Sequence, residues 1–184
     1  MLKTRPLPVL TPGLGLFLAA LVFQTILLVI GPAQQNWVFM SGREVTLKTS
    51  PVDPFDPLRG YYVTLGYDIS TPSRLPGYPT SVSEGQSLYV VLEVPETAEA
   101  AWKPVRVDLE RPDLDSNHVA IKGRLRSGRL VYGIETYYIP EDQRTVIERD
   151  LQQHATSVLV DAKVDATGQA APIRLRIQNR VYEF

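Results

Sequence analysis

An uncharged apolar run near the N-terminus, from Gly13 to Ile30, most constrains how this chain can fold. Its eighteen residues, GLGLFLAALVFQTILLVI, are interrupted only by Gln24 and Thr25. A helix needs about 20 apolar residues to cross a bilayer core, so the run predicts a transmembrane helix. The organisation that we expect has four parts: a cytoplasmic N-terminus (1–12), a transmembrane signal anchor (13–31), a juxtamembrane linker (32–42) and an extracytoplasmic β domain (43–184).

The residues around the run predict where the helix ends and how it is oriented. Pro12 suits a first helical turn, and Gly31-Pro32 is typical of a helix stop. Lys3 and Arg5 lie on the short N-terminal side, whereas residues 32–42 carry no charge. The positive-inside rule therefore predicts a single-pass protein of the inner or plasma membrane, with its main domain periplasmic in a Gram-negative cell.

A cleaved signal peptide is the alternative interpretation of the same run. Gly31-Pro32-Ala33 would then supply the small-residue cleavage site. The apolar run is longer than the roughly 7–15 residues usual for a signal peptide, which favours the anchor. Both interpretations place the main domain outside the cytoplasm.

Composition excludes several classes of function. The chain has no cysteine, so it forms no disulfide and has no thiolate nucleophile or metal ligand. Its 19 Lys and Arg residues are balanced by 20 Asp and Glu residues, which argues against a nucleic-acid partner. The two histidines, His118 and His154, are isolated in sequence, so we expect no metal site and no cofactor.

Alternation of apolar and polar residues with period two dominates the chain after residue 40 and predicts β-strands. Leu88 to Val94 is apolar on both faces except at Glu93, as in a central strand. The predicted fold class is mainly β: an N-terminal transmembrane helix followed by a small antiparallel β barrel or sandwich of about eight strands with one helix. The expected strands cover residues 43–48, 61–69, 88–94, 105–109, 119–126, 130–139, 158–164 and 173–177.

One helix is expected among these strands. Pro140 suits its first turn, and acidic residues follow at once, where the helix dipole favours them. Val146, Ile147 and Leu151 form a narrow apolar stripe that would cover one end of the β domain.

A basic stripe of Lys122, Arg124 and Arg126 lies on the polar face of one expected strand. Such a stripe would suit lipid headgroups. However, we expect the strand that carries Arg106 and Asp108, with Glu110 beyond it, to be its neighbour. Cross-strand pairs would then neutralise the stripe.

Residues Gly60 to Tyr67, GYYVTLGY, follow a Pro-rich approach, DPFDPLR, over residues 53–59. Together with the segment YGIETYYIPE at residues 132–141, they resemble the GDYXXLXY family of bacterial membrane-anchored proteins. The resemblance covers most of the extracytoplasmic domain and implies a membrane-anchored protein without assigning it an activity. The chain departs from the motif at Tyr61, which stands where the motif has its Asp.

Several residues around the motif are binding candidates. Asp53 and Asp56 could ligate a hard cation, or could close Asx turns on their own backbone. Glu135 is expected on a strand face shared with Tyr137, partly buried, with Arg59 as its counter-charge. That pair would either shape a pocket or lock the barrel. The full set of binding candidates is Asp53, Asp56, Arg59, Tyr62, Tyr67, Glu135, Tyr137 and Glu141.

The preferred functional hypothesis is a non-enzymatic binding or accessory module for another integral membrane protein, because the sequence shows no catalytic constellation. The Pro-rich loop over residues 71–86, with Tyr78 near its centre, is part of the expected contact surface. One alternative is a hydrolase similar to membrane-bound signal peptidases, with Ser50 as nucleophile and Lys103 or Lys122 as base. Another is a small-ligand receptor with its site in the barrel mouth.

Overall fold

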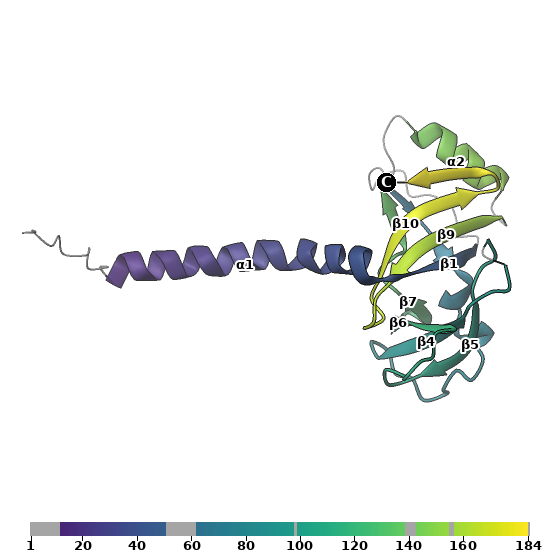
Figure 1. Ribbon diagram of the computed structural model, residues 1–184, viewed down its shortest axis with the longest axis horizontal. Helices are drawn as coiled ribbons and strands as arrows, with labels where there is room; N and C mark the ends of the chain where they lie inside the picture. The colour runs from purple at the N-terminus through teal and green to yellow at the C-terminus, as the bar shows by residue number, and fades with distance from the viewer. Residues whose placement is uncertain (1–11, 51–61, 98, 139–142, 155–156, 184) are drawn as a thin grey trace, which may run out of the picture. The chain divides into compact units, whose positions relative to one another are not determined.

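The structure is a computed structural model that describes residues 12–50, 62–97, 99–138, 143–154 and 157–183 (Figure 1). The chain divides into two compact units, Met1–Asn36 and Trp37–Phe184, and each is described by itself. Four of the binding candidates lie outside the described residues: Asp53, Asp56, Arg59 and Glu141.

Helix α1 spans Pro12–Ser41. It continues past Gly31-Pro32, where the sequence predicted its end, because a proline removes one backbone hydrogen bond while the following N–H groups still reach carbonyls one turn back. The helix ends at Ser41, and the N–H of the next residue, Gly42, donates to the Val38 carbonyl at 2.9 Å. Within the described part of the chain, no helix is both long and apolar enough to cross a membrane.

The second unit is mainly β, with antiparallel strands throughout. A five-stranded sheet has the order β11-β10-β9-β1-β3, a four-stranded sheet has the order β5-β4-β6-β7, and β2 pairs with β8. In Figure 1 the five-stranded sheet lies above the four-stranded one. The strands are β1 (Arg43–Ser50), β2 (Tyr62–Thr64), β3 (Gly66–Tyr67), β4 (Ser87–Glu93), β5 (Lys103–Asp108), β6 (His118–Arg126), β7 (Arg129–Val131), β8 (Thr136–Tyr138), β9 (Val158–Val164), β10 (Ala170–Ile177) and β11 (Arg180–Glu183).

Eleven strands stand in the described residues where the sequence predicted about eight. The segments 61–69 and 130–139 each contain two short strands instead of one long one, and β11 was not predicted. The first segment is interrupted at Leu65, and residues 68–70 form a short 3-10 helix, η1 (Asp68–Ser70). The second is interrupted by a turn at Gly133, which has a φ of 83°.

Strand β4 lies between β5 and β6, as expected for a strand that is apolar on both faces. The expectation that β5 and β6 are neighbours is therefore wrong, because the connection between them carries β6 to the far side of β4. Arg106 pairs instead with Asp108 of its own strand, at 2.8 Å. The predicted neutralisation of the basic stripe by the acids of β5 is therefore wrong for the described strands.

The two sheets share one apolar core. Val45 and Val160 of the five-stranded sheet and Val90 and Ile121 of the four-stranded sheet are all completely buried. Backbone hydrogen bonds also join the sheets, from Trp102 N–H to the Thr46 carbonyl and from Lys122 N–H to the Gly168 carbonyl, both at 2.8 Å. The polar groups of otherwise free strand edges are thereby satisfied.

Helix α2 (Arg144–Gln153) contributes to the same core and lies above the five-stranded sheet in Figure 1. Ile147 is completely buried and Leu151 partly so, as the predicted stripe requires, whereas Val146 is 42% exposed. The helix begins at Arg144, and Pro140, its predicted start, lies outside the described residues.

The Pro-rich segment 71–86 contains no strand, in agreement with its prediction as a long loop. It begins with a 3-10 turn, η2 (Pro72–Arg74), and Leu75 is buried in the core directly after it. Tyr78 also packs partly against the core. These two contacts fix the loop to the domain.

Candidate functional site

The GYYVTLGY segment is joined to residues 132–135 by a set of buried hydrogen bonds. The N–H of Leu65 donates to the Glu135 carbonyl at 2.7 Å. The hydroxyl of Tyr67 donates to the Ile134 carbonyl at 2.7 Å, and the hydroxyl of Tyr132 donates to the Ile69 carbonyl at 2.6 Å. The two sequence segments that carry the family resemblance are therefore packed together in the core.

Glu135 closes the turn beside these tyrosines. One carboxylate oxygen accepts the N–H of Tyr132 at 2.6 Å, and the other accepts the N–H of Gly133 at 2.9 Å. Glu135 lies between β7 and β8 rather than on a continuous strand, so the strand face predicted for it does not exist. Its expected partner Arg59 lies outside the described residues. The backbone supplies donors to both oxygens, so a cation is not needed to satisfy this carboxylate.

The phenols of Tyr67 and Tyr132 stay protonated at neutral pH. Burial raises the pKa of both groups well above its ordinary value, and the nearby charge of Glu135 raises it further. A neutral phenol is a hydrogen-bond donor, which is the role that both side chains play here. The cluster therefore stabilises the fold and supplies no general base.

The remaining candidates near the motif are Tyr62 and Tyr137. Tyr62 of β2 pairs in register with Tyr138 of β8, and Val63 with Tyr137. Tyr137 is buried, and its hydroxyl donates to the Tyr182 carbonyl at 3.3 Å. The structure thus brings Tyr67, Glu135 and Tyr137 into one region, and their binding role stays a prediction.

The residues of the hydrolase alternative lie on different sheets. Ser50 ends β1 opposite Gly66, whereas Lys103 and Lys122 belong to β5 and β6. The ammonium group of Lys122 lies 6.0 Å from the centre of the Tyr89 ring. No hydrogen bond joins Ser50 to either lysine in the part of the chain that the structure describes.

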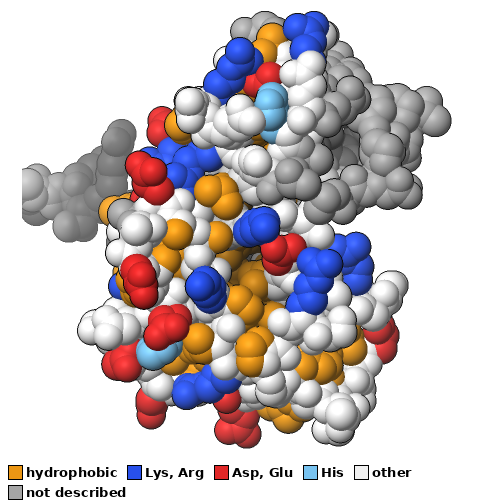
Figure 2. Space-filling model, turned by 90° about the vertical axis from the view of Figure 1, so that its right-hand side faces the viewer, with side chains coloured by type: hydrophobic (Ala, Val, Ile, Leu, Met, Phe, Trp, Pro, Cys, Tyr) orange, Lys and Arg blue, Asp and Glu red, His pale blue; other side chains and the backbone are white. Residues whose placement is uncertain are grey.

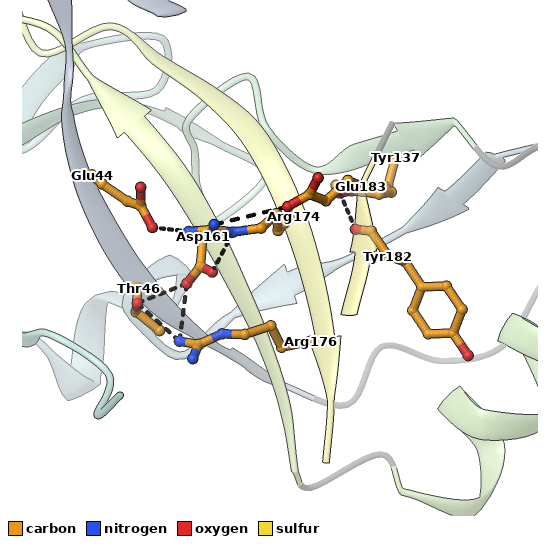
Figure 3. Close-up of polar contacts among 8 residues, drawn as sticks. All are labelled: Glu44, Thr46, Tyr137, Asp161, Arg174, Arg176, Tyr182 and Glu183. Atoms are coloured by element: carbon orange, nitrogen blue, oxygen red, sulfur yellow. Dashed lines mark hydrogen bonds and ion pairs between the residues drawn. The ribbon is translucent and has the colours of Figure 1, made fainter. Parts of the chain in front are cut away.

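A charged row crosses the outer face of the five-stranded sheet, and sequence analysis did not single it out (Figure 3). Thr46, Asp161, Arg174 and Glu183 lie opposite one another on β1, β9, β10 and β11. Asp161 is only 2% exposed. The sequence does contain one indication of a buried acid: Asp161 is the single acidic residue in the mostly apolar strand VLVDAKV.

The carboxylate of Asp161 is satisfied from three sides. It accepts the Thr46 hydroxyl at 2.7 Å and the Arg174 Nε–H at 3.1 Å, and it lies 3.0 Å from a terminal nitrogen of Arg176. Arg174 also contacts Glu44, and one of its terminal nitrogens lies 3.9 Å from Glu183 (Figure 3). Because each charge has an opposite partner, the row holds four strands in register and leaves no free acid or base.

A second ionic cluster fixes α2 to β11. One oxygen of Asp150 accepts a hydrogen bond from the Tyr182 hydroxyl at 2.7 Å and another from Arg180 at 2.8 Å. The Tyr182 hydrogen bond, with support from Arg180, lowers the pKa of Asp150. This cluster links helix and sheet at one end of the domain.

Two shallow hollows lie on either side of the connection between β5 and β6. One, of about 450 Å³, is lined by residues that include Leu114, Asp115 and His118. The other, of about 540 Å³, lies along the end of β5 and includes Leu109. Both are lined by Arg111, Pro112 and Asp113. We call the exposed segment Leu109–Leu114 and the two hollows beside it the β5–β6 surface.

His118 and Asp115 lie within hydrogen-bond distance in the first hollow, with 2.6 Å between Nδ1 and Oδ1. The hydrogen bond from His118 lowers the pKa of Asp115, and the N–H of Asn117 adds to the effect. No group of three or more His, Cys, Asp or Glu side chains in the described residues is placed to hold a metal ion. This surface presents charged side chains of both signs and two exposed leucines.

The match to a family model settles which family the sequence belongs to. The model of the GDYXXLXY protein family matches residues 24–175, most of the chain. The chain is a member of the GDYXXLXY family. Comparisons with curated proteins and with solved structures give no match. Within this family member, Leu65 and Tyr67 of the motif segment are buried in the core.

Proposed function

We propose that this protein is a membrane-anchored, non-enzymatic binding module whose extracytoplasmic β domain, a small antiparallel sandwich, docks on another integral membrane protein. The β5–β6 surface carries this proposal. Leu109 is 43% exposed and Leu114 is 38% exposed, and charges of both signs stand between them at Arg111 and Asp113. Exposed apolar groups with a charged rim are typical of protein contact surfaces.

The space-filling view supports a docking role over an enclosed ligand site. Figure 2 shows a band of apolar side chains across the middle of one face of the molecule, with Lys, Arg, Asp and Glu side chains around it. Small-molecule sites are concave and bury most of their ligand. The hollows of the β5–β6 surface are open to solvent, which suits the side chains of a partner protein.

Helix α1 supports the anchoring part of the proposal. Eleven large apolar side chains between Leu14 and Val29 are exposed. Exposed apolar area of this extent is unfavourable in water, and lipid would cover it. Lys3 and Arg5 favour an orientation with the N-terminus in the cytoplasm.

Two measurements on the full chain test the anchoring. Alkaline extraction of membranes should leave the protein in the pellet, and protease added outside spheroplasts should digest the β domain. Release into the alkaline supernatant, or protection from external protease, would show that the anchoring or the orientation is wrong.

Site-specific crosslinking tests the docking surface. The sequence contains no cysteine, so a single introduced cysteine is labelled selectively. Leu114→Cys, labelled with a photoactivatable crosslinker at native expression level, should give one discrete adduct with an integral membrane protein. Val181→Cys is the matched control, since Val181 is 55% exposed on β11 and lies outside the β5–β6 surface. Arg111→Glu should abolish the adduct. The absence of an adduct at Leu114, or the same adduct from both positions, would overturn the proposal.

A further inference from the structure

Four cations lie together on the hairpin formed by β6 and β7. Lys122, Arg124 and Arg126 alternate with core-facing residues, so they share the outer face of β6. Arg129 of β7 lies directly opposite Arg126. We call Lys122, Arg124, Arg126 and Arg129 the basic face.

The basic face has no acidic partner among the described residues. In the neighbouring strand β4, Ser87 lies opposite Arg124 and Tyr89 lies opposite Lys122, and neither is acidic. The described ion pairs involve other cations, and the contact described for the ammonium group of Lys122 is with the ring of Tyr89. The acids of β5 are held one strand further away by β4.

The hairpin turn adds to the concentration of charge. Ser127 and Gly128 have φ values of 51° and 74°, as a two-residue turn between antiparallel strands requires. The acid Glu84 also lies at this turn, where its carboxylate accepts the Ser127 N–H at 2.6 Å. Arg126 and Arg129 face each other across this turn, and like charges directly opposite destabilise a sheet. The contacts of the described residues give no structural reason for the arrangement.

The surroundings of the basic face favour an anionic surface over a protein partner. The described residues of β6 and β7 include no exposed large apolar side chain, and protein interfaces rely on such anchors. The chain as a whole has a net charge of −1, so the positive charge is local. A row of cations on a flat strand can contact many phosphates at once without a pocket.

We infer that the basic face of β6 and β7 binds the headgroup phosphates of anionic phospholipids in the membrane that holds the chain. The inference rests on the proposed anchoring, which keeps the domain within reach of one bilayer surface. Tethering raises the effective lipid concentration, so contacts that are individually weak suffice. Arginine suits the contact because its guanidinium group binds phosphate oxygens in pairs.

The test uses the full chain in lipid nanodiscs and reports the distance from the hairpin to the lipid. Ser127→Cys carries a donor fluorophore, and an acceptor is placed on a lipid headgroup. Energy transfer should be greater in discs that contain phosphatidylglycerol than in phosphatidylcholine discs of the same size. High salt should remove the difference, because it screens exposed charges.

Two triple variants separate the basic face from general charge. Arg124→Gln, Arg126→Gln and Arg129→Gln together should abolish the lipid dependence. The control, Lys48→Gln, Lys103→Gln and Arg149→Gln, removes three other exposed cations that form no ion pair among the described residues, and it should keep the lipid dependence. If the first variant does not fold, the labelled chain with its basic face intact still tests the inference. Its energy transfer is compared between the two lipids and between low and high salt.

The outcomes are distinguishable. If the chain does not enter nanodiscs, the proposed anchoring fails and this inference fails with it. If the chain enters but transfer is the same in both lipids, this inference alone is overturned.

Discussion

Tyr67 and Tyr132 form a reciprocal pair of hydrogen bonds, in which each hydroxyl donates to the carbonyl two residues after the other tyrosine. The hydroxyl of Tyr67 donates to Ile134, and the hydroxyl of Tyr132 donates to Ile69. The arrangement joins the motif segment to the turn closed by Glu135. The tyrosine at the end of the GYYVTLGY segment thus satisfies a buried carbonyl of the second segment.

Replacing either tyrosine by phenylalanine removes one donor and leaves a buried carbonyl unsatisfied. We expect Tyr67→Phe and Tyr132→Phe each to lower the free energy of unfolding by about 1–3 kcal/mol. The double variant should cost less than the sum, because both bonds join the same two segments. Urea unfolding in detergent measures each effect. Tyr78→Phe, which removes no described hydrogen bond, should change stability little, and an equal loss in that control would contradict the assignment.

The strand pattern and the central place of β4 followed from the sequence because alternation reports burial directly. The alternation of apolar and polar residues does not reveal the order of the strands in a sheet. The connection over residues 109–117 takes β6 across β4, and nothing local to it distinguishes that path from a hairpin. The predicted pairing of the basic stripe with Arg106 and Asp108 failed for this reason.

The candidate surface was missed by sequence reasoning for a related reason. The sequence predicted Leu109 at the end of a strand and did not single out Leu114, and only the fold shows both leucines exposed beside the two hollows. Glu135 was correctly identified as partly buried, but its partners are backbone N–H groups, which a search for charged side chains does not find. Asp161 was overlooked because its partners, Arg174 and Arg176, belong to the next strand, β10, and the sequence pattern of β9 alone does not show them.

Asp161→Asn tests the charged row. The variant keeps an acceptor for Thr46 but leaves Arg174 and Arg176 without their shared carboxylate. We expect a loss of about 3 kcal/mol, the low end for a broken buried ion pair, because both guanidinium groups keep some contact with water. Glu183→Gln is the control: its side chain is 70% exposed and 3.9 Å from Arg174, so its effect should be under about 0.5 kcal/mol. Similar losses in the two variants would contradict the role given to Asp161.

The Asp150 cluster predicts a pH dependence. Folding lowers the pKa of Asp150, so its contribution is fully present above the unfolded value of about 3.9 and is lost as pH falls through the folded value. Tyr182→Phe removes the hydrogen bond that contributes most to this shift. The stability difference between the natural chain and Tyr182→Phe should therefore be largest near neutral pH and shrink on acidification below that value. Urea unfolding at a series of pH values measures it. A difference that does not change with pH would show that the hydroxyl does not act through Asp150.

Gly123→Ala tests how closely β6 approaches the tyrosine pair. A Cβ at Gly123 would lie 2.8 Å from a ring carbon of Tyr132, and that ring is buried and held by its bond to Ile69. Alanine normally suits a strand better than glycine, yet here we expect a loss of about 1–3 kcal/mol from overpacking. In a Tyr132→Ala background the ring is absent, so the same substitution should be neutral or stabilising. A thermal-unfolding double-mutant cycle measures this reversal of sign. Equal losses in both backgrounds would mean that Gly123 is required for its backbone and not for the room that it leaves to Tyr132.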